Sequence, residues 1–363
     1  MIKKILIIIN NLGVGGAERV VVHDVNEMLK MGLDVKLITL KNEKEFSLEG
    51  GLLLEKHKKI LIPFASFFDF KSWRKLHKEI KDYKPDLVVT HLWFANTIGR
   101  LAAYFAGVSR VISFEQNVYD SIKTKKMFFV DWFLQIFSNK IIAVSEAVKK
   151  SLIRHFIKES KIEVIHNSID IEPFQRSITP NIKVRKEFAI PTDAFLYIFI
   201  GRLIHQKAVD IILAAFKEVG SGFLLIVGQG NDREDLEREV EKKGLSGRVV
   251  FAGVRHDIPQ LLSSADCFIL PSRYEGSPLV LIEALAAGIS IIVSDFEAAK
   301  EIIIHEKNGL IVPRENVQKL KDAMVRIKED SVLRARLSAE AKKTANNFSI
   351  SSHVRAILRY INI

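Results

Sequence analysis

Two glutamates, Glu275 and Glu283, stand eight residues apart where an apolar run gives way to a helical one. The run at 267–272 is predicted to be a strand, and a helix is predicted to begin at Pro278, because a proline in the first helical turn loses no hydrogen bond. Unpaired N–H groups and the helix dipole at such a start favour a bound anion such as a phosphate. The residues expected to surround that anion are Gly276, Ser277, Pro278 and Leu279.

The two acids are suited to different tasks. Glu275 is expected in the loop before the helix, where its carboxylate can reach the hydroxyl groups of a bound sugar. Glu283 falls inside an apolar helix, and a buried carboxylate there needs hydrogen-bonding partners, which a ribose diol would supply. For this pair taken alone, a loop acid and a surface helical acid are the competing interpretation.

Two cations, Arg202 and Lys207, follow a second apolar run at 195–200, which is predicted to be a strand. Arginine offers a planar fork of donors and lysine a mobile point charge, so the two can converge on one anion. For this motif alone, two loop cations in surface ion pairs are the competing interpretation.

A glycine-rich loop at 11–19 follows the first predicted strand and opens a helix. Such a loop suggests dinucleotide binding, but the G-x-G-x-x-G spacing is absent, and Thr39-Leu-Lys41 stands where a ribose-binding acid belongs. The pair Gly15-Gly16 permits close approach of the backbone to a diphosphate or an acceptor hydroxyl, because neither residue has a Cβ.

Apolar strands and amphipathic helices alternate along the chain, which is typical of parallel sheets covered on both faces. The predicted strands are 4–9, 34–40, 86–91, 110–115, 140–144, 162–165, 195–201, 223–227, 249–252, 267–270 and 290–294. The predicted helices are 16–30, 72–82, 95–106, 127–138, 146–156, 209–218, 233–243, 258–263 and 278–287. The segment 294–301 is expected to be the loop after the last strand.

The sequence therefore predicts an α/β protein with two parallel-sheet domains, residues 1–172 and 173–345, and a helical segment 346–363 able to return to the first domain. Because parallel sheets bind ligands at the carboxyl ends of their strands, the two domains are expected to face one another across a cleft. A chain of 363 residues, 48% of them apolar, is long enough for two cores.

The composition also bounds the class of protein. Cys267 is the sole cysteine and lies in a predicted buried strand, so neither a disulfide framework nor a cysteine metal site is expected. The first apolar run is too short for the core of a signal peptide, and no run of about 20 uncharged apolar residues occurs. These observations favour a cytoplasmic protein without a spanning helix.

The formal net charge of +11 is concentrated in the first half of the chain. Residues 56–84 carry nine basic and three acidic residues among six aromatics, and 123–133 has the same character. Cations beside exposed aromatics suit an anionic membrane interface, whereas aromatics in the core beside solvated lysines are the competing interpretation. No nucleic-acid-binding motif accompanies the charge, so nucleic acid is not expected as a partner.

Four motifs in order along the chain resemble the retaining glycosyltransferases of family 4, which have the GT-B fold. They are Gly15-Gly16-Ala-Glu, Gly201-Arg202 with Lys207, Gly228-Gln-Gly230 and Glu275-x7-Glu283. The likeness covers essentially the whole chain, and the paired glutamates with the Arg/Lys pair are its specific part. It implies two Rossmann-like domains facing a cleft, the first binding the acceptor and the second the nucleotide sugar, with a C-terminal helix packed back on the first.

The resemblance also implies roles for single residues. Arg202 and Lys207 match the cations that neutralise the departing diphosphate, and Glu275 matches the acid near the donor sugar, so these three are the expected catalytic residues. Glu283 matches the acid that holds the ribose hydroxyls. The other residues expected to bind the donor are Gly15, Gly16, Gly201, Gly228, Val254, Arg255, Gly276, Ser277, Pro278 and Leu279. Those expected to bind the acceptor are His91, Gln116 and Asn117.

Two departures from the family pattern bear on mechanism. Gln116 stands where many members carry a histidine beside the sugar; an amide can hydrogen-bond a hydroxyl but cannot take its proton, which argues against a general base there. The segment 294–301 lacks the glycines common in the family.

The implied reaction is transfer of a hexosyl group from a nucleoside diphosphate sugar, UDP favoured, to a hydroxyl of a lipid-linked or lipopolysaccharide-type saccharide, with retained configuration. No Asp-x-Asp occurs, so no divalent metal or other cofactor is expected. The enzyme is expected at the inner face of the cytoplasmic membrane. Three alternatives stay open: a transferase for a small soluble acceptor, a sugar-nucleotide epimerase, and an idle partner subunit.

Overall fold

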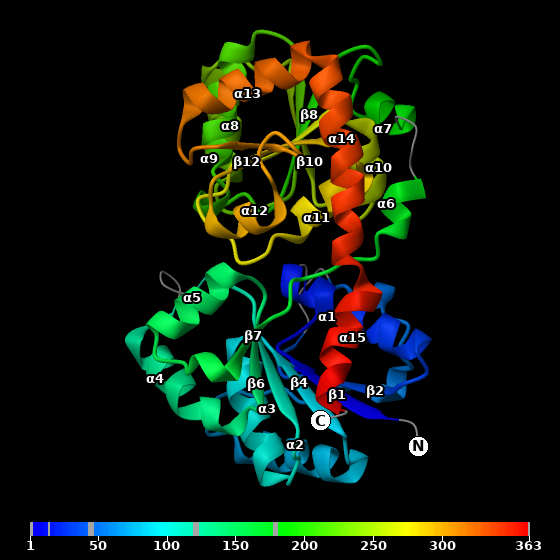
Figure 1. Ribbon diagram of the computed structural model, residues 1–363, viewed down its shortest axis with the longest axis vertical. Coiled ribbons are helices and arrows are strands. Elements are labelled where there is room, and N and C mark those ends of the chain that lie inside the picture. The colour runs from blue at the N-terminus through cyan, green and yellow to red at the C-terminus, as the bar shows by residue number, and fades with distance from the viewer. Residues whose placement is uncertain (1–2, 14, 43–46, 119–122, 177–180, 362–363) are drawn as a thin grey trace. The chain divides into compact units, whose positions relative to one another are not determined.

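The computed structural model describes residues 3–13, 15–42, 47–118, 123–176 and 181–361 and divides into two compact units (Figure 1). The first unit holds the chain up to Ile169 together with Ile350 onward, and the second holds Asp170–Ser349. The sequence predicts the first boundary after residue 172 and the second before residue 346, each within four residues of these positions. Each unit contains one parallel sheet, in agreement with the predicted α/β fold class.

Within the described residues, the first unit has a seven-stranded sheet in the order β3-β2-β1-β4-β5-β6-β7. Its strands are β1 (Lys4–Ile9), β2 (Asp34–Thr39), β3 (Lys59–Leu61), β4 (Leu87–His91), β5 (Val111–Glu115), β6 (Lys140–Ala143) and β7 (Ile162–Val164). All of its strand pairs are parallel. The strand order reverses between β1 and β4, so the loops after these two strands flank the position where such sheets bind ligands.

Alternation along β1 supplies a core on each face of this sheet. Ile5, Ile7 and Ile9 pack on one side, and Leu6 and Ile8 on the other. The first core includes residues of α1 (Gly16–Lys30), α5 (Glu146–Arg154) and α15 (Ile350–Leu358). The second core includes residues of α2 (Phe70–Tyr83) and α3 (Trp93–Phe105). Helix α4 (Lys125–Leu134) continues into a 3-10 turn, η3 (Gln135–Phe137), and contacts α3.

The second unit has, in its described part, a six-stranded parallel sheet in the order β10-β9-β8-β11-β12-β13. Its strands are β8 (Leu196–Ile200), β9 (Phe223–Val227), β10 (Val249–Gly253), β11 (Cys267–Leu270), β12 (Ser290–Ser294) and β13 (Leu310–Val312). Its helices are α6 (Glu172–Arg176), α7 (Ile182–Glu187), α8 (Val209–Val219), α9 (Arg233–Lys242), α10 (Ile258–Ser264), α11 (Leu279–Ala287), α12 (Glu297–Ile302), α13 (Val317–Glu329) and α14 (Ser331–Ala345). Here the strand order reverses between β8 and β11.

The last helix, α15, packs on α1 of the first unit (Figure 1). The amide of Ile350 donates to the carbonyl of Ile169 at 3.1 Å, so the chain re-enters the first unit where it leaves it. Val354 and Ile357 then fill the core beside α1. Residues 362 and 363 of the predicted returning segment lie outside the described residues.

One expectation about the elements was wrong. The segment 294–301 is not the loop after a last strand, because β13 follows it and Glu297–Ile302 forms α12. Both β13 and β3 are three-residue strands at sheet edges, too short for an alternating pattern to be read. In the described ranges, no helix combines the length and the apolar character that crossing a bilayer requires.

Candidate active site

In the second unit, the loops that follow β8 and β11 carry most of the residues predicted to act on a donor. These loops flank the reversal of strand order, where an open parallel sheet binds its ligands. The first contains Gly201 to Lys207, and the second runs from Pro271 through Glu275 to α11. Sheet topology therefore brings together two motifs that lie almost 70 residues apart in the sequence.

The loops after β8 and β9 touch through their backbones, which explains two glycines. Gly228 has φ of +138°, and a Cβ there would lie 1.9 Å from the carbonyl oxygen of Gly201. A Cβ on Gly230 would lie 2.1 Å from the carbonyl oxygen of Leu203. The amide of Leu203 in turn donates to the carbonyl of Gln229 at 2.9 Å. Gly228, a predicted donor-binding residue, thus has a packing requirement that holds without any ligand.

Lys207 and Glu275 form an ion pair, with 2.5 Å between Nζ and Oε1. The Glu275 carboxylate also accepts from the Ser272 hydroxyl at 2.7 Å and from the Gln206 amide at 3.3 Å. Gln206 is fixed in turn by the carbonyl of Tyr274, 2.8 Å from its Nε2. Both charged side chains are largely buried, so the pair is held in one geometry at the end of β11.

Arg202 behaves differently from Lys207. Its side chain is exposed, and it makes neither a hydrogen bond nor an ion pair with the part of the chain that the structure describes. A guanidinium in this state is available to an incoming anion at no cost of breaking an internal contact. The two cations therefore differ. Lys207 is engaged in a buried ion pair, whereas the Arg202 side chain is exposed and makes no ion pair with the described residues.

The start of α11 lies four residues after Glu275. Pro278 is the N-cap of the helix rather than a residue of its first turn, and α11 begins at Leu279. Within the described residues, the amides of Gly276 and Leu279 make no backbone hydrogen bond. The residues Gly276, Ser277, Pro278 and Leu279 are all buried around this start. The predicted anion site at a helix N-terminus is thus sterically well defined.

Glu283 lies in the middle of α11 and is fully buried. Every neighbour from Leu279 to Ala286 on this helix is also buried, so Glu283 is a carboxylate inside an apolar helix, as the sequence predicts. Its competing interpretation as a surface helical acid is wrong. Its proposed partner, a ribose diol, stays a prediction.

Arg255, expected near the nucleobase with Val254, has its guanidinium engaged inside the unit. It donates to Asp257 at 2.7 Å and 2.8 Å and to Glu187 on α7 at 3.1 Å. Donating these hydrogen bonds to Asp257 and then to Glu187 raises the pKa of Arg255 further above its usual range. Its cation also lies 5.4 Å from the ring of Phe188. A base-binding role at this loop would therefore use its backbone or the outer face of the guanidinium.

In the first unit, the glycine pair lies at the amino end of α1. Gly15 is the N-cap, with extended backbone, and Gly16 is the first helical residue. Gly16 is exposed, and a Cβ there would meet nothing within 4 Å. The open approach to this helix end is what the predicted diphosphate or acceptor contact requires.

The predicted acceptor residues lie at the ends of β4 and β5. Gln116 is buried, and its side-chain oxygen accepts from the Asn167 amide at 3.1 Å, while Asn117 is half-buried beside it. His91 is fully buried, and its ring stacks on Phe114 with 4.6 Å between centroids. Gln116 and Asn117 therefore offer neutral polar groups at this edge of the sheet.

Two family models match the chain, one to each half: Glycosyltransferase Family 4 to residues 14–173 and Glycosyl transferases group 1 to residues 181–344. A UDP-Gal:alpha-D-GlcNAc-diphosphoundecaprenol alpha-1,3-galactosyltransferase of Escherichia coli is 30% identical over 80% of this chain and 78% of its own. The chain belongs to glycosyltransferase family 4. The family predicted from the motifs is therefore confirmed, and the protein is an enzyme.

Two further comparisons are consistent with this transferase family. The lipopolysaccharide core biosynthesis glycosyltransferase LpsD of Rhizobium meliloti is 27% identical over 91% of this chain and 90% of its own. The crystal structure of Anabaena HepE in complex with UDP-glucose superposes with a TM-score of 0.86 at 21% identity and covers 99% of both chains. The latter likeness supports the GT-B fold.

His91 of the transferase belongs to a buried polar group that sequence reasoning missed. Asp24 of α1 lies 3.4 Å from Nε2 of His353 on α15, and all three residues are buried. Burial lowers the pKa of His91 to about 4, so its imidazole is neutral at neutral pH. Burial also opposes a charge on His353, but the Asp24 carboxylate and the His166 carbonyl outweigh it and raise the pKa of His353.

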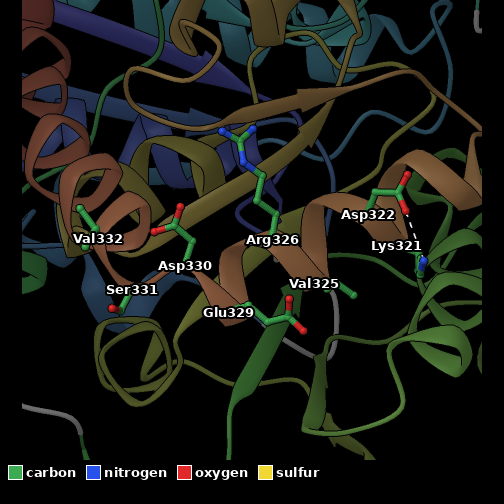
Figure 2. A pocket seen from close by; sticks show the side chains of 8 residues that line it. All are labelled: Lys321, Asp322, Val325, Arg326, Glu329, Asp330, Ser331 and Val332. Atoms are coloured by element: carbon green, nitrogen blue, oxygen red, sulfur yellow. Dashed lines mark hydrogen bonds and ion pairs between the residues drawn. The ribbon is translucent and has the colours of Figure 1, made fainter.

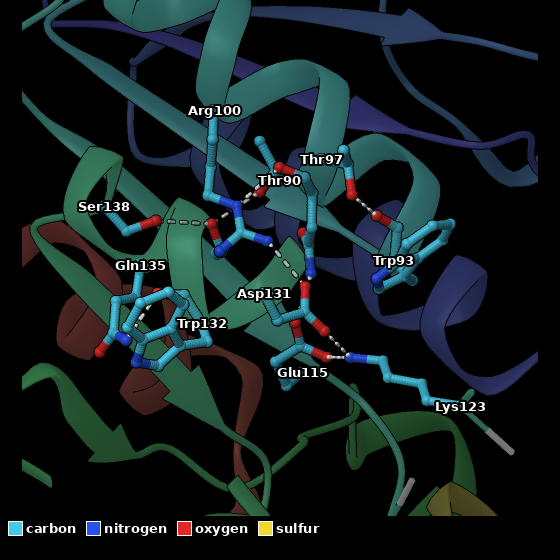
Figure 3. Close-up of polar contacts among 12 residues, drawn as sticks. Thr90, Trp93, Thr97, Arg100, Glu115, Lys123, Asp131, Trp132, Gln135 and Ser138 are labelled. Carbon is cyan, nitrogen blue, oxygen red and sulfur yellow. Dashed lines mark hydrogen bonds and ion pairs between the residues drawn. The ribbon is translucent and has the colours of Figure 1, made fainter. Parts of the chain in front are cut away.

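A second buried network in the transferase joins α3, α4 and the end of β5 (Figure 3). Lys123 lies 2.7 Å from Asp131 and 3.1 Å from Glu115, and Arg100 lies 3.1 Å from Asp131. Burial and the neighbouring Glu115 raise the pKa of Asp131. The signal in the sequence is a charge inside an otherwise apolar helical run, Arg100 in one and Asp131 in another, but no spacing reveals the partners.

A surface cavity of about 650 Å³ lies at the corner between α13 and α14 (Figure 2). Its polar lining is committed locally: Lys321 pairs with Asp322, Arg326 pairs with Glu306, and the Asp330 side chain caps α14. None of its lining residues comes from the loops that carry Lys207 and Glu275. The cavity is therefore unrelated to the chemistry at the strand ends.

Proposed function

We propose that this transferase moves a hexosyl group from a UDP-sugar to a hydroxyl of a lipid-linked or lipopolysaccharide-type saccharide, with retention and without a divalent metal. The observation that carries the proposal is the buried Lys207–Glu275 pair at the approach to α11, with Arg202 open beyond the neighbouring strand. The activities for which the relatives are named support the substrate classes. Their names mention a UDP-galactose donor with a diphosphoundecaprenol-linked acceptor, and lipopolysaccharide core biosynthesis.

The leaving diphosphate gathers negative charge as the bond from the sugar C1 to its phosphate oxygen breaks. Arg202 meets that charge directly, and the amides at the start of α11 add oriented dipoles. Lys207 can shift its ammonium from Glu275 toward the phosphate, because a lysine on a flexible stem keeps three donors. Glu275 is then left to accept hydrogen bonds from the sugar hydroxyls.

The acceptor side supplies no strong base among the residues predicted to bind it. Gln116 cannot take a proton, and a neutral His91 with a pKa of about 4 is a weak base. We propose that the acceptor hydroxyl attacks C1 on the face that the diphosphate leaves. Its proton passes to the departing phosphate oxygen, the new glycosidic bond forms on that face, and the configuration is retained.

A donor screen followed by product analysis tests the proposal. Thermal-shift measurements with UDP-, GDP- and ADP-sugars are expected to show stabilisation by UDP-sugars, and turnover with a polyprenyl-diphosphate saccharide is expected to persist in EDTA. The anomeric proton coupling of the product, measured by NMR, is expected to match the donor. An inverted product, or loss of turnover in EDTA that Mg²⁺ restores, would overturn the corresponding part of the mechanism.

The acceptor class also implies a place of work. A polyprenyl-linked saccharide is held in a bilayer, so we propose that the enzyme works peripherally at the inner face of the cytoplasmic membrane. The excess of basic residues in the first half of the chain supports attraction to anionic lipids. Sedimentation with anionic vesicles tests this, since binding that is absent at low salt would contradict it.

A further inference from the structure

Helix α4 is built with its acid inside and its aromatic residues outside. Its buried residues are Asp131 and Leu134. Its outer side exposes Phe129 by 64%, Trp132 by 46% and Phe133 by 52%, and Ile136 of η3 by 62%. The spacing 129, 132, 133, 136 is one face of a helix. A helix normally turns such an apolar face to the core, whereas α4 leaves it exposed.

The buried network prevents α4 from rolling its aromatic face inward. Asp131 is held from α3 by Arg100 and from its own side by Lys123, at 3.1 Å and 2.7 Å (Figure 3). Arg100 is fixed further by the carbonyl of Asn96, 2.8 Å from its Nε. Turning the helix would bury the aromatic face only by exposing Asp131 and leaving two buried cations without it, which is costly.

Neighbouring elements extend the same apolar surface. The ring of Tyr104, near the end of α3, packs on Phe137 at 4.6 Å, and Phe137 contacts Phe133 at 6.1 Å. Phe156, just after α5, is joined through Gln135, whose Nε2 donates to the carbonyls of Trp132 and Phe156. We call this surface the α4 face; its exposed members are Tyr104, Phe105, Phe129, Trp132, Phe133, Ile136 and Phe156.

Most charges around the α4 face are positive, and the exposed acid that follows Lys158, Glu159, is paired with Lys149 at 3.1 Å. Lys125 and Lys126 are exposed at the start of α4, and Lys158 is exposed just beyond Phe156. The single acid of α4, Asp131, is buried. Cations that flank an exposed aromatic surface without an intervening acid complement the headgroups of anionic lipids, while the rings suit the interfacial layer of a bilayer.

The other candidate patch, residues 56–84, divides its aromatics between the core and the surface. Phe64 is buried, and Trp73 packs edge-on against it at 5.5 Å while donating to the carbonyl of Phe67. Phe68 and Phe70 stay exposed, but Asp69 lies between them and caps α2. For this segment the competing interpretation of core aromatics holds only in part, for Phe64 and Tyr83, because Phe67 is exposed as well.

We propose that the α4 face is the surface by which the enzyme docks on the anionic leaflet of a bilayer, with Trp132 in the interface. The inference rests on the proposed function in one respect, namely that a lipid-linked acceptor makes docking useful. It assigns the docking to a surface that is separate from the residues predicted to bind donor and acceptor.

Vesicle partitioning with matched aromatic variants tests the assignment. Vesicles of phosphatidylcholine with about 30% phosphatidylglycerol are expected to sediment the wild-type enzyme at low salt. The variant Phe129→Gln/Phe133→Gln is expected to lower the partition coefficient by about tenfold or more, because two rings no longer insert. The control Phe68→Gln/Phe70→Gln removes two rings that are even more exposed and is expected to partition like wild type. Equal loss in both variants, or in neither, would overturn the assignment.

Trp132 provides a direct reporter that a folding defect cannot mimic. Brominated lipids are expected to quench the tryptophan fluorescence of wild type, and Trp132→Phe is expected to remove that quenching while the melting temperature is kept. If the quenching persists in Trp132→Phe, another surface inserts. If the Gln variants instead convert a dimer to a monomer in size-exclusion chromatography and keep vesicle binding, the α4 face is a subunit interface and the proposal fails.

Transfer to a water-soluble acceptor analogue separates this inference from the proposed function. The Phe129→Gln/Phe133→Gln variant is expected to keep the turnover of wild type on that analogue. Absence of turnover in wild type with UDP-sugars would contradict the proposed function and leave the vesicle result standing. Wild-type turnover without any vesicle binding would contradict the docking surface and the peripheral location, and would leave the proposed transfer reaction standing.

Discussion

The Lys207–Glu275 ion pair alters the chemical role that can be assigned to Glu275, the first of the two glutamates. The sequence assigns Lys207 to the diphosphate and Glu275 to the sugar, but in the structure each neutralises the other. In a buried pair of this kind, each charge compensates the other until a ligand separates the two groups. Arg202 has no such partner among the described residues, so it is the cation that we expect to meet the ligand first.

Replacing Arg202 by alanine is expected to lower turnover without destabilising the fold. Loss of one group that stabilises developing charge costs about 10²- to 10³-fold in rate, or about 3–4 kcal/mol. The side chain is exposed and makes no hydrogen bond or ion pair with the described residues, so the melting temperature is expected to stay within about a degree of wild type. Steady-state kinetics checks the expected loss of turnover, and calorimetry checks the expected melting temperature. Turnover within threefold of wild type would contradict the assignment.

Lys207→Met is expected to damage both properties. Turnover falls as for Arg202→Ala, and the unfolding free energy also falls, by about 3 kcal/mol, because Glu275 is left buried without its cation. Adding Glu275→Gln removes the stranded charge, so the double variant is expected to regain stability and to stay inactive. Urea denaturation of the two single variants and the double variant measures the coupling. A double variant no more stable than Lys207→Met would show that the pair is not coupled.

At the scale of elements, buried strands were the most predictable, whereas the long helices α13 and α14 were not predicted. Strands 223–227, 267–270 and 290–294 and helix α1 agree with their predicted ranges, because each is a strong apolar period bounded by Gly, Pro or polar residues. Glu283 inside α11 followed from the same periodicity. The partners of Glu275 could not be predicted, since Ser272, Gln206 and Lys207 meet through sheet topology and turn geometry that no spacing encodes.

Helix α4 shows the opposite limit. That a helix forms here could be predicted from the sequence. The period of its aromatic residues, however, does not show which face is buried, and taken alone it predicts that the aromatic face packs on the core. The three-dimensional partners of Asp131 decide the matter, and they come from α3 and from the segment after β5. Local sequence therefore fixes that a helix forms there, and long-range charge pairing fixes its rotation.

The attachment of α15 to α1 is expected to make stability depend on pH in two opposite ways. His91 has its pKa lowered from 6.5 to about 4, so between those values the unfolded chain binds a proton that the folded chain does not, and stability falls as the pH drops. His353 has its pKa raised, so its contribution is complete below pH 6.5 and is lost as the pH rises through the folded value.

Denaturation curves between pH 4 and pH 9 check this pH dependence of stability, with one variant for the acid side and one for the alkaline side. His91→Phe is expected to remove the acid-side slope, worth on the order of 3 kcal/mol, because folding lowers the pKa of His91 from 6.5 to about 4. His353→Gln is expected to remove the fall on the alkaline side and leave the acid limb. The same slopes in both variants as in wild type would show that the buried group around Asp24 does not titrate.

At the scale of the whole molecule, the residues proposed to act in the reaction are divided unequally between the two units. Arg202, Lys207, Glu275, Glu283 and the start of α11 all belong to Asp170–Ser349, which is continuous in sequence and has its own sheet. The first unit is discontinuous, since α15 supplies Val354 and Ile357 to its core after the chain has completed the second. The second unit therefore has what it needs to fold alone, and the first does not.

Expressed alone, residues 170–349 are expected to fold cooperatively and to bind UDP while catalysing no transfer. The diphosphate contacts proposed for Arg202 and the α11 amides remain, and only the contribution proposed for Gly15 and Gly16 is lost, so the Kd is expected to rise by about tenfold at most. Calorimetric titration of UDP measures this, with Arg202→Ala in the same fragment as the control that should weaken binding. Residues 1–169 are expected to stay unfolded or aggregate, because the core beside α1 lacks α15. A folded 1–169 fragment, or a folded 170–349 fragment that ignores UDP, would show that folding and donor binding are shared between the units rather than divided as their chain connectivity indicates.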